Sequence, residues 1–202
     1  MIRAVMFDLG NVVVDVNESK LFKELAEKSD KNQGHIKRAW EKSKARKSFE
    51  KGQLSSFEFY QKFCSDIGAR INYDEFKSIY CHIFTLNKNV EKLIHKLKDE
   101  GYKLVLISNT DALHFHYLET HFKIVKQFDE LALSYKLGVR KPNPRIYFKA
   151  IKMANESASD CAYFDDISEF VWTARLLRVK AFKFTGYDKM IKNLRKLKVT
   201  GL

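Results

Sequence analysis

The chain of 202 residues is poor in cysteine, proline and glycine, of which it holds three, two and eight, respectively. Three scattered cysteines are too few for a disulfide framework or a zinc site, which favours a reduced, cytoplasmic protein. No stretch approaches 18 consecutive apolar residues, so the sequence excludes a membrane-spanning helix. The N-terminal segment carries Arg3 and Asp8 and has no cleavage site, and we therefore expect no signal peptide.

Apolar residues, by contrast, are plentiful. Hydrophobic residues make up 45% of the chain and aromatic residues 13%. This content is enough to bury a full core, so a disordered chain is excluded. The length suits one domain with an insertion.

The formal net charge of +12 is the unusual feature of the composition. Residues 31–51 hold eight basic and two acidic residues, and residues 175–202 hold nine basic and one acidic. These two patches therefore carry +6 and +8, and the rest of the chain sums to −2. Neither patch has a nucleic-acid motif with aromatic residues at regular spacing, so solvated helix faces are favoured over a nucleic-acid site. The first patch could still draw anionic substrates toward a nearby cleft.

Short apolar runs at five places predict buried strands, and segments with helical spacing separate most of them. The expected strands are residues 2–7, 103–108, 131–134, 161–164 and 179–184. Strands that alternate with helices indicate an α/β fold, here a Rossmann-like parallel sheet core with helices on both faces. The segment after the first strand shows helical spacing and no convincing strand. We therefore expect an α/β core domain of residues 1–16 and 85–202, with a small α-helical cap domain of residues 17–84 inserted after the first strand.

Polar side chains stand at the predicted carboxyl ends of the strands, where open α/β sheets bind ligands. They are Asp8 after the first strand, Ser108 and Asn109 after the second, Lys141 after the third, and Asp165 and Asp166 after the fourth. Both prolines of the chain, Pro142 and Pro144, follow Lys141 closely and stiffen its loop. Mg²⁺ prefers carboxylate oxygens, and a phosphoryl group needs donors such as a lysine, a hydroxyl and backbone amides. The set therefore suits phosphoryl transfer, in which Asp8 can act as a nucleophile.

The same segments, in this order, resemble the four motifs of the haloacid dehalogenase superfamily of hydrolases. They are residues 7–12 (FDLGNV), 106–109 (LISN), 138–147 (GVRKPNPRIY) and 163–166 (YFDD). The helical segment between the first two motifs is similar to the cap of the superfamily's dehalogenase-like and sugar-phosphatase-like branch. The resemblance covers nearly the whole chain.

The resemblance implies an Mg²⁺-dependent phosphatase that works through an aspartyl-phosphate intermediate. Its substrate would be a small phosphorylated metabolite, of which a sugar phosphate is one candidate. Asp8 would attack phosphorus, and Lys141 would be the second catalytic residue. The phosphoryl oxygens would be held by Ser108, Asn109 and Lys141. The Mg²⁺ ligands would be Asp8, the backbone carbonyl of Gly10, Asp166 and Asp165.

Two positions depart from the usual phosphatase pattern. Gly10 stands where these phosphatases usually have a second aspartate as general acid and base, whose loss can cost roughly 10²- to 10⁴-fold in rate. The opening Asp-Leu-Gly-Asn also resembles a branch of sugar-1-phosphate phosphatases, so Gly10 by itself does not indicate an inactive enzyme. Asp15 could replace this acid, although a polar hinge between core and cap is its favoured role. Phe170 stands where Asn or Asp often orders the metal site, and Ser168 or Glu169 would have to compensate.

Two other functions stay open. A catalytically weak or inactive relative would bind a phosphorylated ligand, nucleic acid or a protein partner, and Gly10 and Phe170 motivate this alternative. A haloacid dehalogenase would attack carbon without Mg²⁺, but such enzymes do not usually need a paired acidic motif such as Asp165 and Asp166. His114 is expected on a helix surface rather than at a metal site. The motifs specify neither the substrate nor the oligomeric state.

Overall fold

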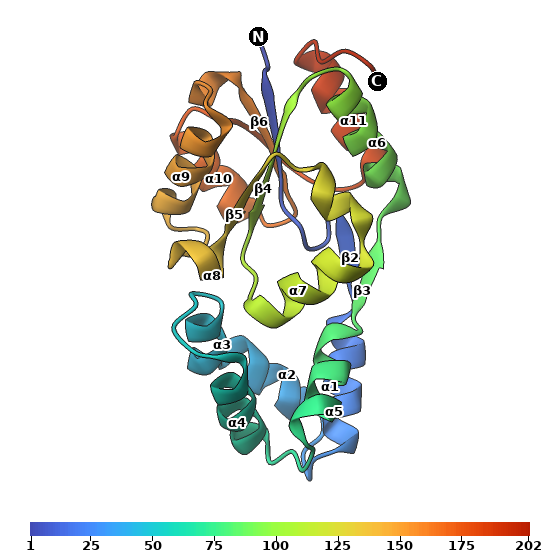
Figure 1. The fold of residues 1–202 in the computed structure, drawn as a ribbon, viewed down its shortest axis with the longest axis vertical. Coiled ribbons are helices and arrows are strands. Elements are labelled where there is room, and N and C mark those ends of the chain that lie inside the picture. The colour runs from blue at the N-terminus through green and yellow to red at the C-terminus, as the bar shows by residue number, and fades with distance from the viewer.

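A computed structural model describes residues 1–202. At its centre is a parallel five-stranded sheet in the order β5-β4-β1-β6-β7. The strands are β1 (Ala4–Phe7), β4 (Lys103–Ser108), β5 (Glu130–Leu133), β6 (Cys161–Asp165) and β7 (Lys180–Lys183). Because β1 lies in the middle, β4 and β6 flank its carboxyl end (Figure 1). The predicted Rossmann-like α/β fold is confirmed.

Helices cover both faces of this sheet. Val5 and Phe7 of β1 face the helices α6 and α11, whereas Ala4 and Met6 face α9 and α10. Burial on both sides explains why the strand reads as a continuous apolar run instead of an alternating one. The helical elements of this part are α6 (Lys88–Asp99), α7 (Ala112–His121), η1 (Lys123–Gln127), α8 (Ser134–Leu137), α9 (Pro144–Ala154), η2 (Ala158–Asp160), α10 (Ser168–Leu176) and α11 (Tyr187–Lys196).

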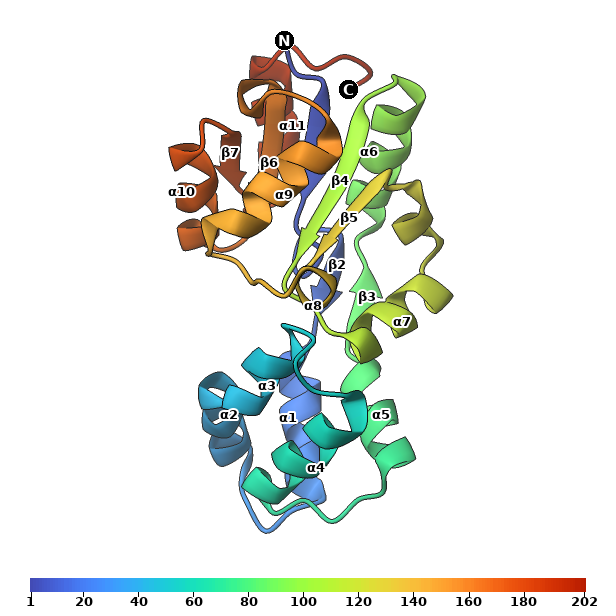
Figure 2. The ribbon, with the colours of Figure 1, turned by 60° about the vertical axis from the view of Figure 1, so that its left-hand side comes forward.

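Five further helices form a separate bundle beyond the carboxyl edge of the sheet, at the end of the molecule opposite to both termini (Figures 1 and 2). They are α1 (Glu18–Glu27), α2 (Gln33–Lys42), α3 (Lys44–Phe49), α4 (Ser56–Ile67) and α5 (Tyr73–Cys81). The bundle has a hydrophobic core of its own, in which the rings of Phe49 and Phe59 stack with centroids 4.7 Å apart. None of the helices of the chain has both the length and the apolar character needed to cross a membrane.

Local sequence signals define where the bundle's helices begin and end. At the start of α4, the N–H of Glu58 donates to the Ser55 hydroxyl at 3.2 Å, and the N–H of Ser55 donates to the Glu58 carboxylate at 2.8 Å. This reciprocal pair is a capping box, which satisfies backbone donors that have no partner inside the helix. Gly68 ends the same helix with a φ of 66°, in the left-handed region that glycine adopts without a Cβ penalty.

Two short antiparallel strands connect the bundle to the sheet. They are β2 (Val14–Val16) and β3 (Phe84–Leu86), which we call the ribbon. The sequence analysis predicted no strand at either place, because three residues are too few to show an alternating pattern. Asp15 pairs with Thr85 in the ribbon, and its side chain is exposed.

Candidate active site

The three central strands bring predicted site residues to one edge of the sheet. Asp8 follows β1, Ser108 ends β4 and Asp165 ends β6. The N–H of Asp8 donates to the carbonyl of Phe164 at 2.9 Å, which aligns the ends of β1 and β6. All three residues are nearly buried, with exposed fractions of 7%, 3% and 0%, respectively. The parallel strand order therefore places side chains that are distant in sequence next to one another.

Lys141 reaches this edge from the loop before α9 and is only 2% exposed. Its Nζ lies 2.8 Å from Oδ1 of Asp8 and 2.7 Å from Oδ2 of Asp165. It also donates to the hydroxyl of Tyr163 at 3.2 Å. Burial opposes the charge, but the two carboxylates outweigh burial and raise the pKa of Lys141. The lysine is thus a fixed cation between Asp8 and Asp165.

The side chain of Asn109 holds the backbone of Lys141. Its Oδ1 accepts from the N–H of Lys141 at 2.7 Å, and its Nδ2 donates to the carbonyl of the same residue at 3.0 Å. Ser108 also lines the cavity described below, and its hydroxyl has no hydrogen-bond partner in the protein. Ser108 is therefore free to bond to a ligand, whereas the amide of Asn109 is engaged in positioning Lys141.

Carboxylate oxygens of Asp8, Asp165 and Asp166 lie within 4.8 Å of one another. Burial raises the pKa of Asp8 to about 7 although Lys141 opposes this shift, and burial also raises the pKa of Asp166. Both oxygens of Asp165 already have partners, since Oδ1 accepts from the N–H of Ile167 at 2.8 Å and Oδ2 accepts from Lys141. Asp8 and Asp166 therefore offer the freer oxygens for a hard divalent cation, which prefers oxygen ligands.

Asn11 orders Asp166, a role that the sequence analysis missed. Its Nδ2 donates to Oδ2 of Asp166 at 3.0 Å, and its Oδ1 accepts from the N–H of Val16 at 3.2 Å. The φ of Asn11 is 56°, in the left-handed region that asparagine tolerates better than most residues. The available signal was an asparagine directly after Gly10 in a predicted turn. Asn11 thus links the end of β1, the ribbon and the acidic cluster.

Gly10 lines the cavity at the position of the usual second aspartate. A Cβ at this residue would lie 3.3 Å from Cγ2 of Val16, so a larger side chain would have to displace the ribbon slightly. Asp15 is exposed on the ribbon and does not line the cavity. It is therefore not placed to supply the missing acid, in agreement with its favoured role in the connection.

Phe170 lies against Lys141 instead of contributing to the acidic cluster. Its ring centroid is 5.1 Å from Nζ of Lys141, within the range of a cation–π interaction. Ser168 and Glu169 are exposed and do not line the cavity, so neither compensates for Phe170. The side-chain hydrogen bond that orders Asp166 comes from Asn11.

A cavity of about 580 Å³ lies between the sheet edge and the helical bundle. Its volume is typical of pockets that take small molecules. On the sheet side it is lined by the predicted residues Asp8, Gly10, Ser108, Asn109, Lys141 and Asp166. On the bundle side it is lined by side chains that include Glu18, Trp40, Arg46 and Glu50. The bundle and the predicted site residues therefore enclose one space.

Glu50, at the end of α3, is 8% exposed and lies between two arginines. Its Oε1 is 3.6 Å from Nε of Arg46, and its Oε2 contacts Nε of Arg140. Burial raises the pKa of Glu50, and the two arginines oppose this shift. The guanidinium carbon of Arg46 lies 4.5 Å from the ring centroid of Trp40. Because Arg140 directly precedes Lys141, this group of charges joins the bundle to the loop of the buried lysine.

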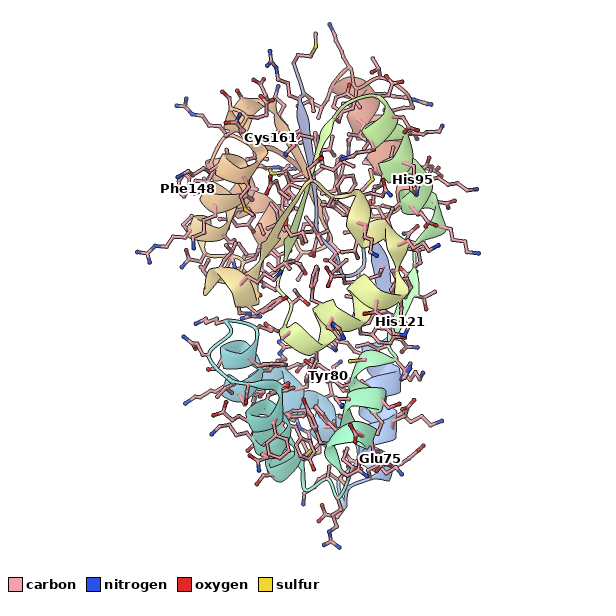
Figure 3. The ribbon with its side chains drawn as sticks, in the orientation of Figure 1. Glu75, Tyr80, His95, His121, Phe148 and Cys161 are labelled. Atoms are coloured by element: carbon pink, nitrogen blue, oxygen red, sulfur yellow. The ribbon has the colours of Figure 1, made fainter.

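A second contact between bundle and sheet domain involves Tyr80 of α5, which lies at the junction (Figure 3). Its hydroxyl donates to Oδ2 of Asp111 at 2.7 Å. The ring of His114 stacks on Tyr80 with centroids 3.9 Å apart, and its Nδ1 is 3.2 Å from Oδ2 of Asp111. The prediction of a surface position for His114 is wrong, because the bundle covers this part of α7 and leaves the side chain 12% exposed.

Residues 2–169 match the family model of the haloacid dehalogenase-like hydrolases, and the chain belongs to this family. The match spans all four motifs and the helical bundle between the first two. The family predicted from the motifs is thereby confirmed, and the protein is an enzyme of the hydrolase class.

Characterised relatives of similar length include two phosphatases. The chain is 25% identical over 190 residues to a D-ribitol-5-phosphate phosphatase of Bacteroides thetaiotaomicron, with 91% of this chain and 92% of the relative covered. It is 26% identical over 201 residues to a sesquiterpene phosphatase of Aspergillus oryzae, with 96% of each covered. A crystal structure of a family enzyme from B. thetaiotaomicron, in complex with magnesium and inorganic phosphate, has a TM-score of 0.79 at 20% identity and covers 91% of this chain and 94% of its own. This last likeness shows that the two proteins share a fold.

Proposed function

We propose that the protein is an Mg²⁺-dependent phosphatase that hydrolyses the phosphate monoester of a small metabolite, with Asp8 as nucleophile. The observation that carries this proposal is the cluster of three carboxylates beside a buried lysine. A carbon–halogen hydrolase would need the nucleophile and the lysine but no site for a cation. The names of the two phosphatase relatives support the same reaction class.

The bonds of Asp8 suit it to nucleophilic attack. Its Oδ1 accepts from the N–H of Leu9 at 2.7 Å and lies 2.8 Å from Nζ of Lys141, which leaves Oδ2 without a partner in the protein. In the proposed reaction a carboxylate oxygen of Asp8 forms a bond to phosphorus while the bond from phosphorus to the leaving alcohol breaks. The leaving oxygen takes a proton from solvent and departs as the alcohol. Water then attacks phosphorus and gives up a proton, which releases phosphate, restores the carboxylate and balances the proton taken up in the first step. Lys141 and the Ser108 hydroxyl would hold the phosphoryl oxygens throughout.

The donor set of the acidic cluster fits Mg²⁺. We propose Asp8, Asp166 and the backbone carbonyl of Gly10 as its ligands, with Asp165 beside them and fixed by Lys141. Two or three protein oxygens are a usual complement for Mg²⁺, which keeps several waters or takes phosphate oxygens. When bound there, the cation would offset negative charge on the phosphoryl group.

We propose that residues 17–84 act as the cap of an α/β core made of residues 1–16 and 85–202. The cavity between the two parts supports this assignment, since it is lined by both. A cap that closes over the cleft excludes bulk water and selects the leaving group. Of the basic residues between 31 and 51, Arg46 is the one whose side chain lines the cavity.

The test is turnover of 4-nitrophenyl phosphate and a panel of sugar phosphates in the presence of Mg²⁺. We expect turnover by the wild type, its loss on chelation, and a decrease of about 10³-fold or more in Asp8→Asn. Asp15→Asn is the matched control, because Asp15 is an exposed aspartate outside the cavity. Turnover of a 2-haloacid without Mg²⁺ would support the dehalogenase alternative. No turnover, together with salt-sensitive binding of nucleic acid, would support the alternative of an inactive binding protein.

A further inference from the structure

Residues 134–141, which we call the lysine segment, run from the start of α8 to Lys141. The core holds this segment at both ends through two successive residues that follow β4. The hydroxyl of Ser134 accepts from the N–H of Thr110 at 3.0 Å and donates to the carbonyl of Thr110 at 2.9 Å. At the other end, the side chain of Asn109 holds the backbone of Lys141. The core therefore anchors the segment at its first and at its last residue.

The bundle approaches the lysine segment at two further points. Glu50, the residue after α3, pairs with Arg140, which directly precedes Lys141. The turn that follows brings Gly52 against α8, where an added Cβ would overlap the carbonyl oxygen of Tyr135. The φ of Gly52 is 68°, so both the backbone conformation and the lack of space require glycine. The bundle thus contacts the segment next to each of its anchored ends.

The ion pair between Glu50 and Arg140 orders the lysine segment more than it orders the bundle. Glu50 has a second cation, Arg46, whose Nε is 3.6 Å away in the same turn of α3, so the bundle itself supplies this partner. Arg140 has no carboxylate partner other than Glu50. The side chains of Arg140 and Glu50 are only 20% and 10% exposed, and solvent therefore screens their attraction little. Without the bundle, Arg140 would lose its one anionic partner.

We infer that Glu50 and Gly52 are positioning residues for Lys141, so that docking of the bundle on the lysine segment completes the active site. This inference depends on the proposed phosphatase function and adds to it a role of the bundle in the chemical step. Glu50 acts through Arg140, and Gly52 acts through the backbone of Tyr135. The bundle then does more than cover the cleft, because it supports the segment that carries the lysine of the proposed reaction.

The first experiment asks whether Glu50 and Asn109 support the same segment. Hydrolysis of 4-nitrophenyl phosphate is measured for Glu50→Gln, Asn109→Ala and the double variant. Each support compensates in part for loss of the other, so we expect kcat of the double variant to fall about 5-fold or more below the product of the two single effects. In Glu50→Gln alone, we expect kcat to change more than KM, since the lysine acts on the bound phosphoryl group.

Glu75→Gln is the matched control for this experiment. Glu75 forms a 2.7 Å ion pair with Lys28 within the bundle and does not line the cavity. Its loss removes a charge from the bundle without touching the lysine segment. We therefore expect Glu75→Gln to leave the effect of Asn109→Ala on kcat unchanged.

The second experiment follows the lysine segment without turnover. Hydrogen–deuterium exchange of the peptides that cover the segment is compared between the wild type and Gly52→Ala. The added methyl group pushes the bundle away from α8, and we expect exchange in these peptides to become about 10-fold faster or more, since local opening governs it. Gly101→Ala is the matched control, because Gly101 has a φ of 82° and an added Cβ would meet nothing within 4 Å. Both variants bear the cost of alanine at a positive φ, so the difference between them reports the contact to Tyr135.

The outcomes separate this inference from the proposed function. If the wild type shows no Asp8-dependent turnover of 4-nitrophenyl phosphate, the phosphatase function fails and the role of the bundle in the reaction fails with it. If turnover is present but the effects of Glu50→Gln and Asn109→Ala simply multiply, only the positioning role is overturned. Wild-type exchange of the lysine segment in Gly52→Ala overturns it equally. This second measurement decides alone if Glu50→Gln does not fold, as judged by circular dichroism.

Discussion

The side chain of Asn109 bonds to both backbone polar atoms of Lys141, with distances of 2.7 Å to the N–H and 3.0 Å to the carbonyl. The side-chain amide of Asn109, directly after β4, therefore holds the lysine that contacts Asp8. No other side chain of similar size makes the same pair of hydrogen bonds. Asparagine offers an acceptor and a donor on two separate atoms, which an Asp, Ser or Ala does not provide.

Asn109→Ala should lower kcat by about 10- to 100-fold, because the loop of Lys141 loses two hydrogen bonds and the ammonium group shifts from Asp8. Asn109→Asp should also lower it, since the carboxylate keeps an acceptor but lacks the donor. Steady-state kinetics with 4-nitrophenyl phosphate measure the effect. The exposed Asn89 is a suitable control for a neutral Asn→Ala change. A wild-type kcat in both Asn109 variants would show that the amide does not position the lysine.

Mg²⁺ binding should depend on pH in a direction set by Asp8. In the metal-free protein burial raises the pKa of Asp8 to about 7, so the carboxyl is largely protonated at pH 6. A metal ligand must be deprotonated, and binding therefore releases a proton below pH 7. We expect the Mg²⁺ affinity to rise by up to about tenfold per pH unit below pH 7 and to level off above it. Calorimetry from pH 5.5 to 8.5 checks this, and an affinity that is constant between pH 6 and pH 8 would contradict it.

Asn11→Ala should weaken Mg²⁺ binding by about 10-fold or more, because residues that orient metal ligands typically contribute this much. The variant removes the 3.0 Å hydrogen bond to Asp166 and leaves the carboxylates themselves in place. Asn155→Ala is a matched control, since Asn155 has the same φ of 56° but is exposed at the end of α9. Both variants bear the cost of alanine in a left-handed conformation, so a difference between them in Mg²⁺ affinity reports the contact to Asp166. Equal affinities would exclude the proposed role.

Tyr80→Phe should destabilise the protein by about 1–3 kcal/mol, because it leaves the buried Asp111 with one hydrogen-bond donor fewer. Urea unfolding followed by fluorescence measures the free energy. We also expect a higher KM, since the lost contact joins α5 of the bundle to α7 beside the cavity. Tyr73→Phe removes a comparable 2.6 Å hydrogen bond, to Ser56, within the bundle. If Tyr73→Phe raises KM as much as Tyr80→Phe does, the contact between the two parts has no special role in substrate binding.

The strands and the residues at their ends could be predicted from the sequence because both are local. β4 was predicted with its observed bounds, Lys103–Ser108, since an uninterrupted apolar run that ends at a polar residue marks a buried strand. The ribbon was missed because each of its strands has three residues and is stabilised by pairing with a distant partner. The short helix α8, which begins at Ser134, was missed for the similar reason that four residues show no helical period.

By itself, the sequence determined the family, the α/β core, the helical insertion and the motif residues from Asp8 to Asp166. The core and the insertion follow from composition and short spacing, which act between neighbours in the chain, and the family follows from the resemblance of the four motifs. The tertiary structure decided how the motif residues are held: Asn109 on Lys141, Asn11 on Asp166 and Phe170 against the lysine. It also decided which bundle residues face the site, because Glu50 meets Arg140 only after the bundle packs over the sheet edge. Such contacts depend on the packing of separate elements, and no local pattern in the sequence encodes their distance or direction.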